Sequence, residues 1–191
     1  MIILASASPR RTQLLRLLGI AHEVDAAHGV DERPLPGEAP EALAVRLARA
    51  KALGVAPRHP GIPVLAADTV VVLEDEILGK PEDATAAERM LRRLAGRTHD
   101  VVTAVALAVD GNVSADVDRT RVRFRSLSPE LIRDYVATGE PLDKAGSYGL
   151  QGFGAVLVDR IEGDCFGVIG LPLRLVVDLL EAAGRPYRFT R

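Results

Sequence analysis

The stretch "IILASASPRR", residues 2–11, joins a short apolar run to a polar loop and the start of a helix. Residues 2–4 predict a short buried strand, and Pro9 stands where a helix would begin. A helix N-terminus presents free backbone N–H groups and the positive end of the macrodipole, so serines and arginines beside it can form an anion site. The stretch alone is equally consistent with a simpler alternative, in which Ser8 only caps the helix and the arginines are only solvated.

Strands and helices alternate along the rest of the chain. Helices are predicted to begin at Pro9, at Pro40, after Asp83 and at Pro129, and a last helix is predicted at residues 173–183. Strands are predicted at residues 20–24, in two runs around the acidic turn 74–76, at 101–109 and 117–124 around the turn "DGN", at 155–161 and at 187–190. This order predicts an α/β fold, with a mixed sheet flanked by helices.

Composition limits the classes of protein to consider. The 191 residues are 48% hydrophobic and 26% charged, which suits one folded domain or two closely apposed lobes. The net charge of −2 gives no broad basic surface for nucleic acid, and the apolar run 168–180 is interrupted and too short to span a membrane. Cys165 is the only cysteine, so no intrachain disulfide can form. Without a recognisable secretory signal at the start, we expect a cytoplasmic protein.

Several stretches combine residues that bind anions or metals. Only three of the 24 basic residues are lysines, namely Lys51, Lys80 and Lys144, which suggests positions where a compact ammonium is needed. Asp68 interrupts the apolar run "AADTVVV", and "VDER" supplies Glu32 beside a predicted loop. The alternatives are a strand irregularity at Asp68 and a solvated acidic loop.

Two further stretches surround the remaining lysines. Pro81 in "LGKP" holds Lys80 in an extended backbone, and "LDKAGSYGLQG" surrounds Lys144 with glycines. Gln151 both donates and accepts hydrogen bonds, which suits the polar edge of a nucleobase. A turn-rich connection without a ligand is the alternative for the glycines. Taken together, these stretches predict a site for a polyanion and a divalent cation such as Mg²⁺.

Several other sites lack the residues they require. The chain contains neither a P-loop nor a complete dinucleotide fingerprint, and its four histidines are scattered without zinc-ligand spacing. His99 in "GRTHDVVT" is interpreted as a hydrogen-bonded histidine at the start of a strand. No G-x-S-x-G is present, and Cys165 shows no activating partner in the sequence.

Seven motifs in order resemble those of the Maf family of nucleoside triphosphate pyrophosphatases. They are "LASASPRRTQLL", "VDE" followed by "ARAKA", "AADTVV", "LGKPED", "GRTHDVVT", "DKAGSYGLQG" and "GVIGLP". The resemblance implies a single Maf-like domain over residues 1–191, with a two-lobed, inosine triphosphatase-like fold and a central cleft. It implies hydrolysis of a nucleoside triphosphate to the monophosphate and pyrophosphate, with Mg²⁺, Mn²⁺ or a similar metal.

The resemblance also implies roles for individual residues. Asp68 matches the catalytic acid, Glu32 an acid near the metal and the attacking water, and both are candidate metal ligands. The positions expected to hold the substrate are Ser6, Ser8, Arg10, Arg11, Lys51, Thr69, Lys80, Lys144 and Gln151. Within this set, Arg10, Thr69 and Gln151 resemble the combination of the subgroup that acts on dTTP and UTP. Gly167 departs from the asparagine that many members carry.

A binding module is the competing class. The family is named for an effect on septum formation, so the alternative is a regulatory module that responds to nucleotides and hydrolyses them slowly or incidentally. Both classes retain the phosphate site, but only the enzyme requires Asp68. The resemblance further implies a homodimer, and we expect no nucleic-acid or membrane partner.

Overall fold

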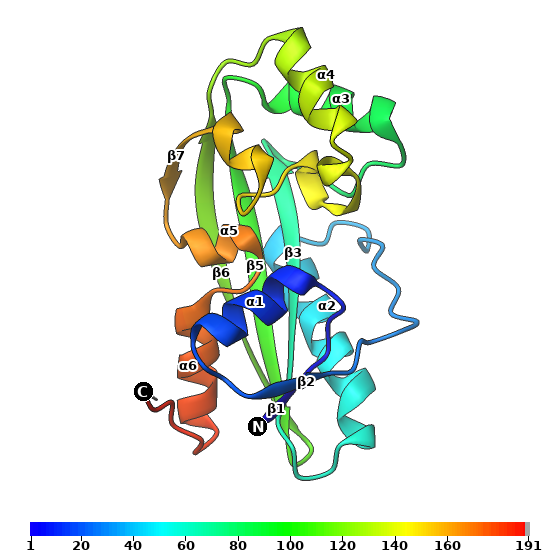
Figure 1. Ribbon diagram of the computed structural model, residues 1–191. Coiled ribbons are helices and arrows are strands. Elements are labelled where there is room, and N and C mark those ends of the chain that lie inside the picture. The colour runs from blue at the N-terminus through cyan, green and yellow to red at the C-terminus, as the bar shows by residue number, and fades with distance from the viewer. Residues whose placement is uncertain (190–191) are drawn as a thin grey trace. The chain divides into compact units, whose positions relative to one another are not determined.

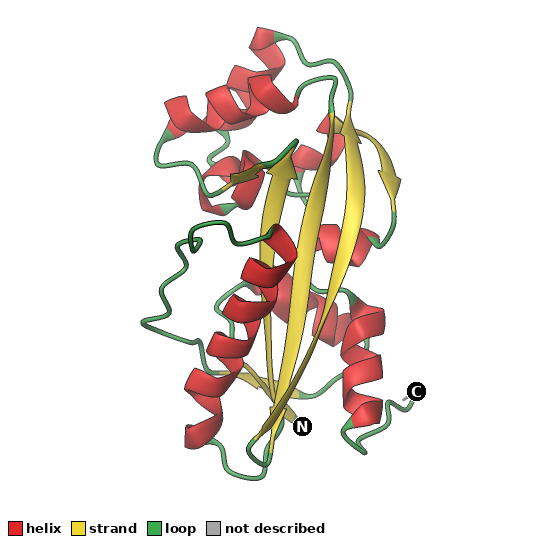
Figure 2. Cartoon of the chain, turned by 180° about the vertical axis from the view of Figure 1, so that it is seen from behind, coloured by secondary structure: helices red, strands yellow, loops and turns green. Residues whose placement is uncertain are grey.

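The computed structural model describes residues 1–189 and divides the chain into two compact units. Unit 1 comprises residues 1–68, 103–118 and the chain from residue 170 onward, and unit 2 comprises residues 69–102 and 119–169. Three long strands, visible in Figure 2, contribute residues to both units.

The described strands form one mixed sheet in the order β2-β1-β3-β5-β6-β7, with β4 paired to β3. The strands are β1 (Ile2–Leu4), β2 (His22–Val24), β3 (Val64–Leu73), β4 (Glu76–Leu78), β5 (Thr98–Val109), β6 (Asn112–Phe124) and β7 (Val158–Glu162). β1 pairs in parallel with β2 and with β3, whereas β3 with β4 and β6 with β7 are antiparallel. The predicted α/β fold on a mixed sheet is therefore confirmed.

Unit 1 places helices on both faces of its strands. These helices are α1 (Pro9–Leu17), α2 (Pro40–Val55) and α6 (Leu173–Ala182), and a 3-10 turn, η1 (Ala56–Arg58), follows α2. In Figure 1, α1 lies in front of the strands. In Figure 2, which shows the chain from the opposite side, α2 lies in front of them, so the two helices cover opposite faces. Proline at the first turn starts both α1 and α2, because it lacks an N–H and its φ suits a helix.

Unit 2 has its own hydrophobic core. Its helices are α3 (Ala84–Leu94), α4 (Pro129–Ala137) and α5 (Cys165–Ile169), and three 3-10 turns are η2 (Glu140–Asp143), η3 (Ala145–Ser147) and η4 (Phe153–Leu157). Phe124 and Tyr148 pack edge to face in this core, with ring centroids 4.7 Å apart. His99 contacts both rings, and its Nε2 lies 2.8 Å from the Tyr148 hydroxyl, as expected for a hydrogen-bonded histidine at the start of a strand.

Predicted boundaries agree best where a cap is local. The carboxylate of Asp83 accepts the N–H of Ala86, and the hydroxyl of Ser128 accepts that of Leu131, which confirms the predicted starts of α3 and α4. Other boundaries were wrong: β6 begins five residues earlier than predicted, β7 begins at Val158 rather than residue 155, and α5 and the 3-10 turns were not predicted. Residues 187–189 form no strand, and Thr190 lies outside the described residues.

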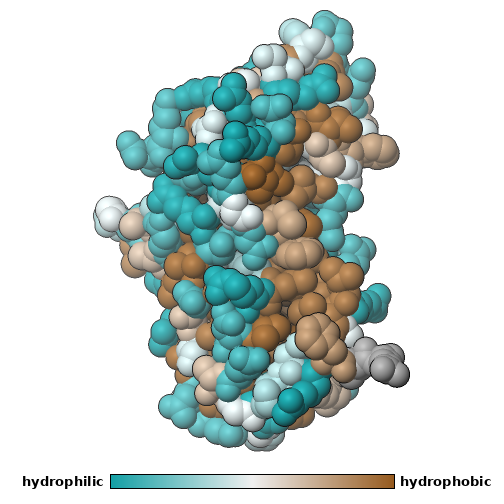
Figure 3. All heavy atoms as spheres, turned by 90° about the vertical axis from the view of Figure 1, so that its left-hand side faces the viewer, coloured by the Kyte–Doolittle hydropathy of each residue, from teal (hydrophilic) through white to brown (hydrophobic). Residues whose placement is uncertain are grey.

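Surface composition gives little further guidance. Apolar side chains reach the surface on the face drawn in Figure 3. In unit 2, Phe153 is 68% exposed and Val156 is 57% exposed. Single exposed apolar side chains are ordinary in folded proteins, so we assign these no role. Among residues 1–189, the helices are too short or too polar to cross a lipid bilayer.

Candidate functional site

The loop before α1 gathers two serines and an arginine at the helix N-terminus. Ser8 is the N-cap residue, but its hydroxyl does not cap the helix, and its N–H donates to the Ser6 hydroxyl at 3.3 Å. Arg11 Nη1 donates to the same hydroxyl at 2.9 Å, and its Nε donates to the carbonyl of Gly170 at 2.9 Å. These bonds hold the guanidinium beside the first turn of α1, at the positive end of the helix dipole. The arrangement suits an anion with several oxygens.

Arg11 also lies in the electric field of nearby charges. Burial lowers the pKa of its guanidinium to about 10, and neighbouring Arg10 acts in the same direction. The carboxylates of Asp68 and Glu32 act in the opposite direction, raising that pKa. Arg11 therefore remains a cation at neutral pH, and an anionic ligand would relieve its repulsion with Arg10.

Lys51 joins two predicted acids. Its Nζ lies 2.5 Å from Asp68 Oδ1 and 2.6 Å from Glu32 Oε1. The Lys51 and Asp68 side chains are 14% and 10% exposed, whereas Glu32 is 53% exposed. Lys51 is on α2, Asp68 is on β3 and Glu32 is in the loop between β2 and α2, so unit 1 brings three distant segments together. One ammonium faces two carboxylates, so these three groups together carry a net negative charge.

Burial changes the acidity of Asp68. Desolvation raises the pKa of its carboxyl above the ordinary value, and the negative Glu32 adds to this effect. The cations Lys51 and Arg11 oppose it. A carboxylate whose pKa is raised is a stronger base than an exposed one, so Asp68 is better suited to accept a proton from water.

The loop that carries Glu32 is fastened to α2 by a second arginine. Arg46 Nε and Nη2 donate to the two carboxylate oxygens of Glu38 at 2.6 and 2.7 Å, and Nη2 also donates to the carbonyl of Arg33 at 3.1 Å. Glu38 in turn accepts the N–H of Leu35 at 3.0 Å. This fork-to-fork contact fixes the loop one residue beyond Glu32, and therefore restrains where its carboxylate lies.

Four predicted site residues belong to unit 2 and are described within it. Thr69 directly follows Asp68 in β3 and is half-buried, while Lys80 and Gln151 are exposed. The ammonium of Lys144 donates to the Glu140 carbonyl at 2.5 Å and to Asp143 at 2.6 Å. Lys144 is thus engaged within its own unit, and its role toward a substrate stays a prediction.

The glycines around Lys144 approach this chain's own side chains. A Cβ at Gly149 would lie 2.7 Å from Lys144 Cε, and a Cβ at Gly152 would lie 2.2 Å from a carboxylate oxygen of Glu140. Glu140 also accepts the N–H groups of Phe153 and Gly154 at 2.8 and 3.0 Å. The close packing of this segment accounts for two of its glycines without a ligand.

The donor set of unit 1 fits a hard divalent cation. Asp68 and Glu32 share one ammonium, so their oxygens lie near one another, and carboxylate oxygens are preferred ligands of Mg²⁺. Within residues 1–189 no cluster of three or more acidic, histidine or cysteine side chains could enclose a metal. Two carboxylates match a Mg²⁺ ion that completes its shell with water and substrate phosphate, rather than an all-protein cage.

Sequence reasoning missed two supports of the site. The carbonyl of Gly170, in "GVIGLP", anchors Arg11, and Gly170 has a φ of +120°, which favours glycine. The Arg46–Glu38 contact had no recognisable signal, because its partners belong to a loop and a helix whose meeting depends on the fold. The quoted motif around Gly170 was the one available indication.

Comparisons with known proteins agree with the predicted resemblance. A family model described as "Maf-like protein" matches residues 1–183. The chain is 56% identical over 186 residues to the dTTP/UTP pyrophosphatase of Myxococcus xanthus (strain DK1622), covering 97% of this chain and 94% of the relative. It is 54% identical over 186 residues to the dTTP/UTP pyrophosphatase of Geotalea uraniireducens (strain Rf4), covering 96% and 95%.

A solved structure agrees on the fold. The Staphylococcus aureus Ham1 protein superposes with a TM-score of 0.52 at 16% identity, over 95% of this chain and 96% of that one. The sequence matches extend over nearly the whole chain, and the chain therefore belongs to the Maf family.

Proposed function

We propose that this chain is a nucleoside triphosphate pyrophosphatase that hydrolyses dTTP and UTP to the monophosphate and pyrophosphate. The observation that carries the proposal is the cluster in unit 1, where Lys51 joins Asp68 to Glu32 and Arg11 lies beside the N-terminus of α1. The relatives named dTTP/UTP pyrophosphatase, at 56% and 54% identity, support the substrate class. Their agreement over the full chain favours an enzyme over a regulatory binding module.

The reaction requires a base, a positioned water and cations. Water attacks the α-phosphorus, the bond from that phosphorus to the bridging oxygen breaks, and pyrophosphate leaves. Asp68 accepts the proton of the water, a role that its raised pKa favours. Arg11, Lys51 and Lys80 neutralise charge on the phosphates, since phosphoryl transfer depends mainly on positioning and electrostatics.

A bound substrate and the Lys51 ion pairs compete for the same ammonium. In the free chain Lys51 is bonded to both carboxylates. Phosphate oxygens arriving beside it would draw the ammonium away from Asp68, which frees that carboxylate to accept a proton from water. The proposal thus couples substrate binding to release of the base.

The carboxylates of Glu32 and Asp68 are the residues that would hold a Mg²⁺ or Mn²⁺ ion. When bound, such an ion supplies positive charge that stabilises the phosphate oxygens. On the strength of the resemblance, we assign the selection of the substrate's nucleobase to Arg10, Thr69 and Gln151. Gln151 is exposed and offers both a donor and an acceptor for a pyrimidine edge.

Product analysis of wild type and Asp68→Asn tests the proposal. Each protein is incubated with dTTP, UTP, CTP, GTP and 7-methyl-GTP with Mg²⁺ or Mn²⁺, and products are separated by ion exchange. We expect monophosphate and pyrophosphate to appear fastest from dTTP and UTP, and Asp68→Asn to be slower by about 10² to 10⁴. Asp178→Asn, an exposed acid on α6, is the matched control and should retain wild-type rates.

Two results would contradict the proposal. Diphosphate with orthophosphate would place the attack at the wrong phosphorus. Nucleotide binding without turnover in the wild type would favour the regulatory module instead.

A further inference from the structure

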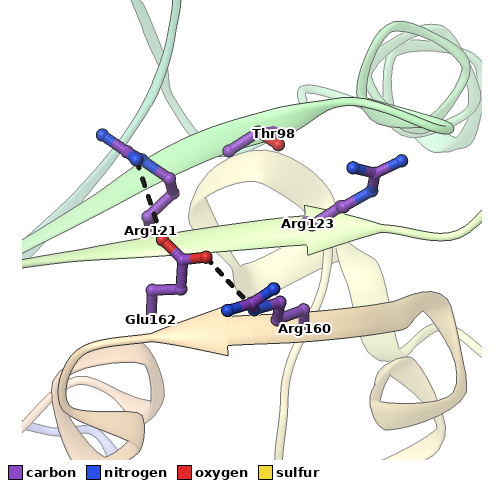
Figure 4. Close-up of a pocket in the computed structure, with 5 residues that line it drawn as sticks. All are labelled: Thr98, Arg121, Arg123, Arg160 and Glu162. Atoms are coloured by element: carbon purple, nitrogen blue, oxygen red, sulfur yellow. Dashed lines mark ion pairs between the residues drawn. The ribbon is translucent and has the colours of Figure 1, made fainter.

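A concave surface in unit 2 contains none of the residues assigned to the candidate site. It is a pocket of about 360 Å³ lined by Thr98, Arg121, Arg123, Arg160 and Glu162. Figure 4 shows these side chains on three neighbouring strands, with Thr98 on β5, two arginines on β6, and Arg160 and Glu162 on β7. We call these five residues the arginine pocket. Three guanidinium groups share it with one carboxylate, so its five lining residues carry a net positive charge, while Asp100 and Asp159 lie 3.9 and 3.5 Å from Arg121 and Arg123.

The pattern of β6 explains why the arginines gather on one face. Along residues 120–124 the side chains of Thr120, Val122 and Phe124 are buried, while Arg121 and Arg123 between them are exposed. Successive side chains of a strand point to opposite faces, so the two arginines lie on the same face, about 7 Å apart along the strand. Because the residues on either side of them are buried in the core, Arg121 and Arg123 both lie on the exposed face of β6.

The register of β6 and β7 opposes like charges. Arg123 is paired with Arg160 across the two antiparallel strands, and Arg121 is paired with Glu162. Like charges that face each other directly across a sheet are destabilising. The Arg123–Arg160 pairing is therefore unfavourable in itself, is offset in part by the carboxylates of Asp159 and Glu162, and would be relieved by an anion between the two guanidinium groups.

The guanidinium groups of the arginine pocket are poorly satisfied within the described residues. Arg121 lies 3.7 Å from Glu162 and 3.9 Å from Asp100, Arg123 lies 3.5 Å from Asp159, and Arg160 lies 3.1 Å from Glu162. None of these contacts has hydrogen-bond geometry, and these three side chains donate no hydrogen bond within residues 1–189. By contrast, Arg58 donates two hydrogen bonds of 2.8 Å to the carboxylate of Asp25. Each guanidinium has five N–H donors, so the pocket presents many donors that make no hydrogen bond within residues 1–189.

We propose that the arginine pocket binds a pyrophosphoryl group, either free pyrophosphate or the diphosphate end of a nucleotide. Guanidinium groups bind phosphate through paired, charge-assisted hydrogen bonds. The facing pair Arg123 and Arg160 clamps one phosphoryl group, and Arg121, two residues along β6, reaches the next. The hydroxyl of Thr98 is a further donor at the rim. The proposal goes beyond the hydrolysis proposed above and does not depend on it.

Isothermal titration with inorganic pyrophosphate, in metal-free buffer, tests the pocket directly. The proteins are Arg11→Ala, which weakens the unit 1 site, and the same chain carrying Arg123→Gln and Arg160→Gln. The charge-matched control adds Arg133→Gln and Arg174→Gln instead, because both arginines are exposed on helices outside the pocket. We expect about one equivalent to bind to Arg11→Ala and to the control. Binding should be about a hundredfold weaker when the two pocket arginines are replaced, at about tenfold for each lost guanidinium.

Two further arms identify the ligand. Inorganic phosphate should bind at least about tenfold more weakly than pyrophosphate, since it engages fewer guanidinium groups. Titration with dTDP then distinguishes the sources: binding as strong as that of pyrophosphate assigns the nucleotide, and weaker binding assigns the free anion. Equal binding of phosphate and pyrophosphate would overturn the two-phosphoryl assignment, as would binding of single-stranded RNA with no response to pyrophosphate.

Arginine Nε–Hε signals in nuclear magnetic resonance spectra of the wild type give a readout that does not rely on altered proteins folding. Signals of Arg121, Arg123 and Arg160 should move on addition of pyrophosphate. Urea unfolding provides the last check, because replacing Arg123 and Arg160 removes like-charge repulsion and should leave stability unchanged or higher. Unmoved signals, equal binding by the pocket variant and its control, or a marked loss of stability would each overturn the proposal.

Discussion

Replacing Lys51 with methionine should destabilise the chain more than any exposed ion-pair change. Methionine keeps the apolar stem of the side chain but leaves the carboxylate of Asp68, 10% exposed, without its partner at 2.5 Å. At an effective dielectric constant of about 20, a pair at this distance attracts by about 7 kcal/mol before desolvation is subtracted. Removing one member of a buried ion pair typically costs about 3–5 kcal/mol, and we expect a loss of this size near pH 7.5.

The pH dependence identifies Asp68 as the cause. Without Lys51, burial raises the pKa of the Asp68 carboxyl further, so the folded variant retains a proton that the unfolded chain releases. The folded variant then binds more protons than the unfolded one, and its stability increases as pH falls, by up to about 1.4 kcal/mol per pH unit. The deficit relative to wild type should therefore narrow on acidification.

Urea unfolding followed by circular dichroism, at pH 5.0 to 7.5, measures both effects. The double variant Lys51→Met/Asp68→Asn removes the unpaired charge and should recover most of the lost stability. Arg174→Met is the matched control, since its pair with Asp178 is exposed and should contribute at most about 0.5 kcal/mol. A loss below about 1 kcal/mol with the same pH slope as wild type would refute the reasoning.

Three other changes address the site and the core. Arg46→Ala should raise the Mg²⁺ concentration for half-maximal dTTP hydrolysis by about tenfold, because it frees the loop that carries Glu32. Arg49→Ala, at an exposed position on the same helix, should leave that concentration unchanged. Equal metal titrations for the two variants would rule out a role of the Arg46–Glu38 contact in positioning Glu32. Arg11→Ala should lower kcat/KM for dTTP by about 10 to 100-fold through KM, measured by steady-state kinetics, and an unchanged KM would exclude a phosphate contact. Burial lowers the pKa of His99 to about 4, so between pH 6.5 and 4 the unfolded chain binds a proton that the folded chain does not. The free energy of unfolding of the wild type should therefore fall by about 3 kcal/mol as the pH decreases through this window. His99→Gln should not show this loss in urea unfolding, and parallel pH curves for the two proteins would contradict the prediction.

Helix starts could be predicted because their chemistry is local. Prolines at the first turn of α1, α2 and α4, and the side-chain caps of α3 and α4, act within a few residues of the helix they begin. Elements that depend on distant partners were predicted less well. α5 has five residues and no periodicity to detect, and the early part of β6 carries only half-buried or exposed side chains.

The candidate site was predictable in its members but not in its contacts. A carboxylate within an apolar strand and the scarcity of lysine mark Asp68 and Lys51 from composition alone. Their meeting depends on how α2 lies against β3, 17 residues away along the chain, and no spacing rule contains that information. The contact between Arg46 and Glu38 could not be predicted at all, because an arginine on a helix and a glutamate in a loop are ordinary surface residues until the fold brings them together.

Because the three lysines are buried to different extents, a reagent that modifies amines should distinguish between them. Lys51 and Lys144 are 14% and 13% exposed and hydrogen-bonded, whereas Lys80 is exposed. Reagents that acylate amines attack accessible, unprotonated groups, so Lys80 should react before Lys51 and Lys144. Because acylation converts the ammonium into a neutral amide, a ligand that covers Lys80 should slow its labelling, and the rate of labelling would report on that ligand without any engineered cysteine.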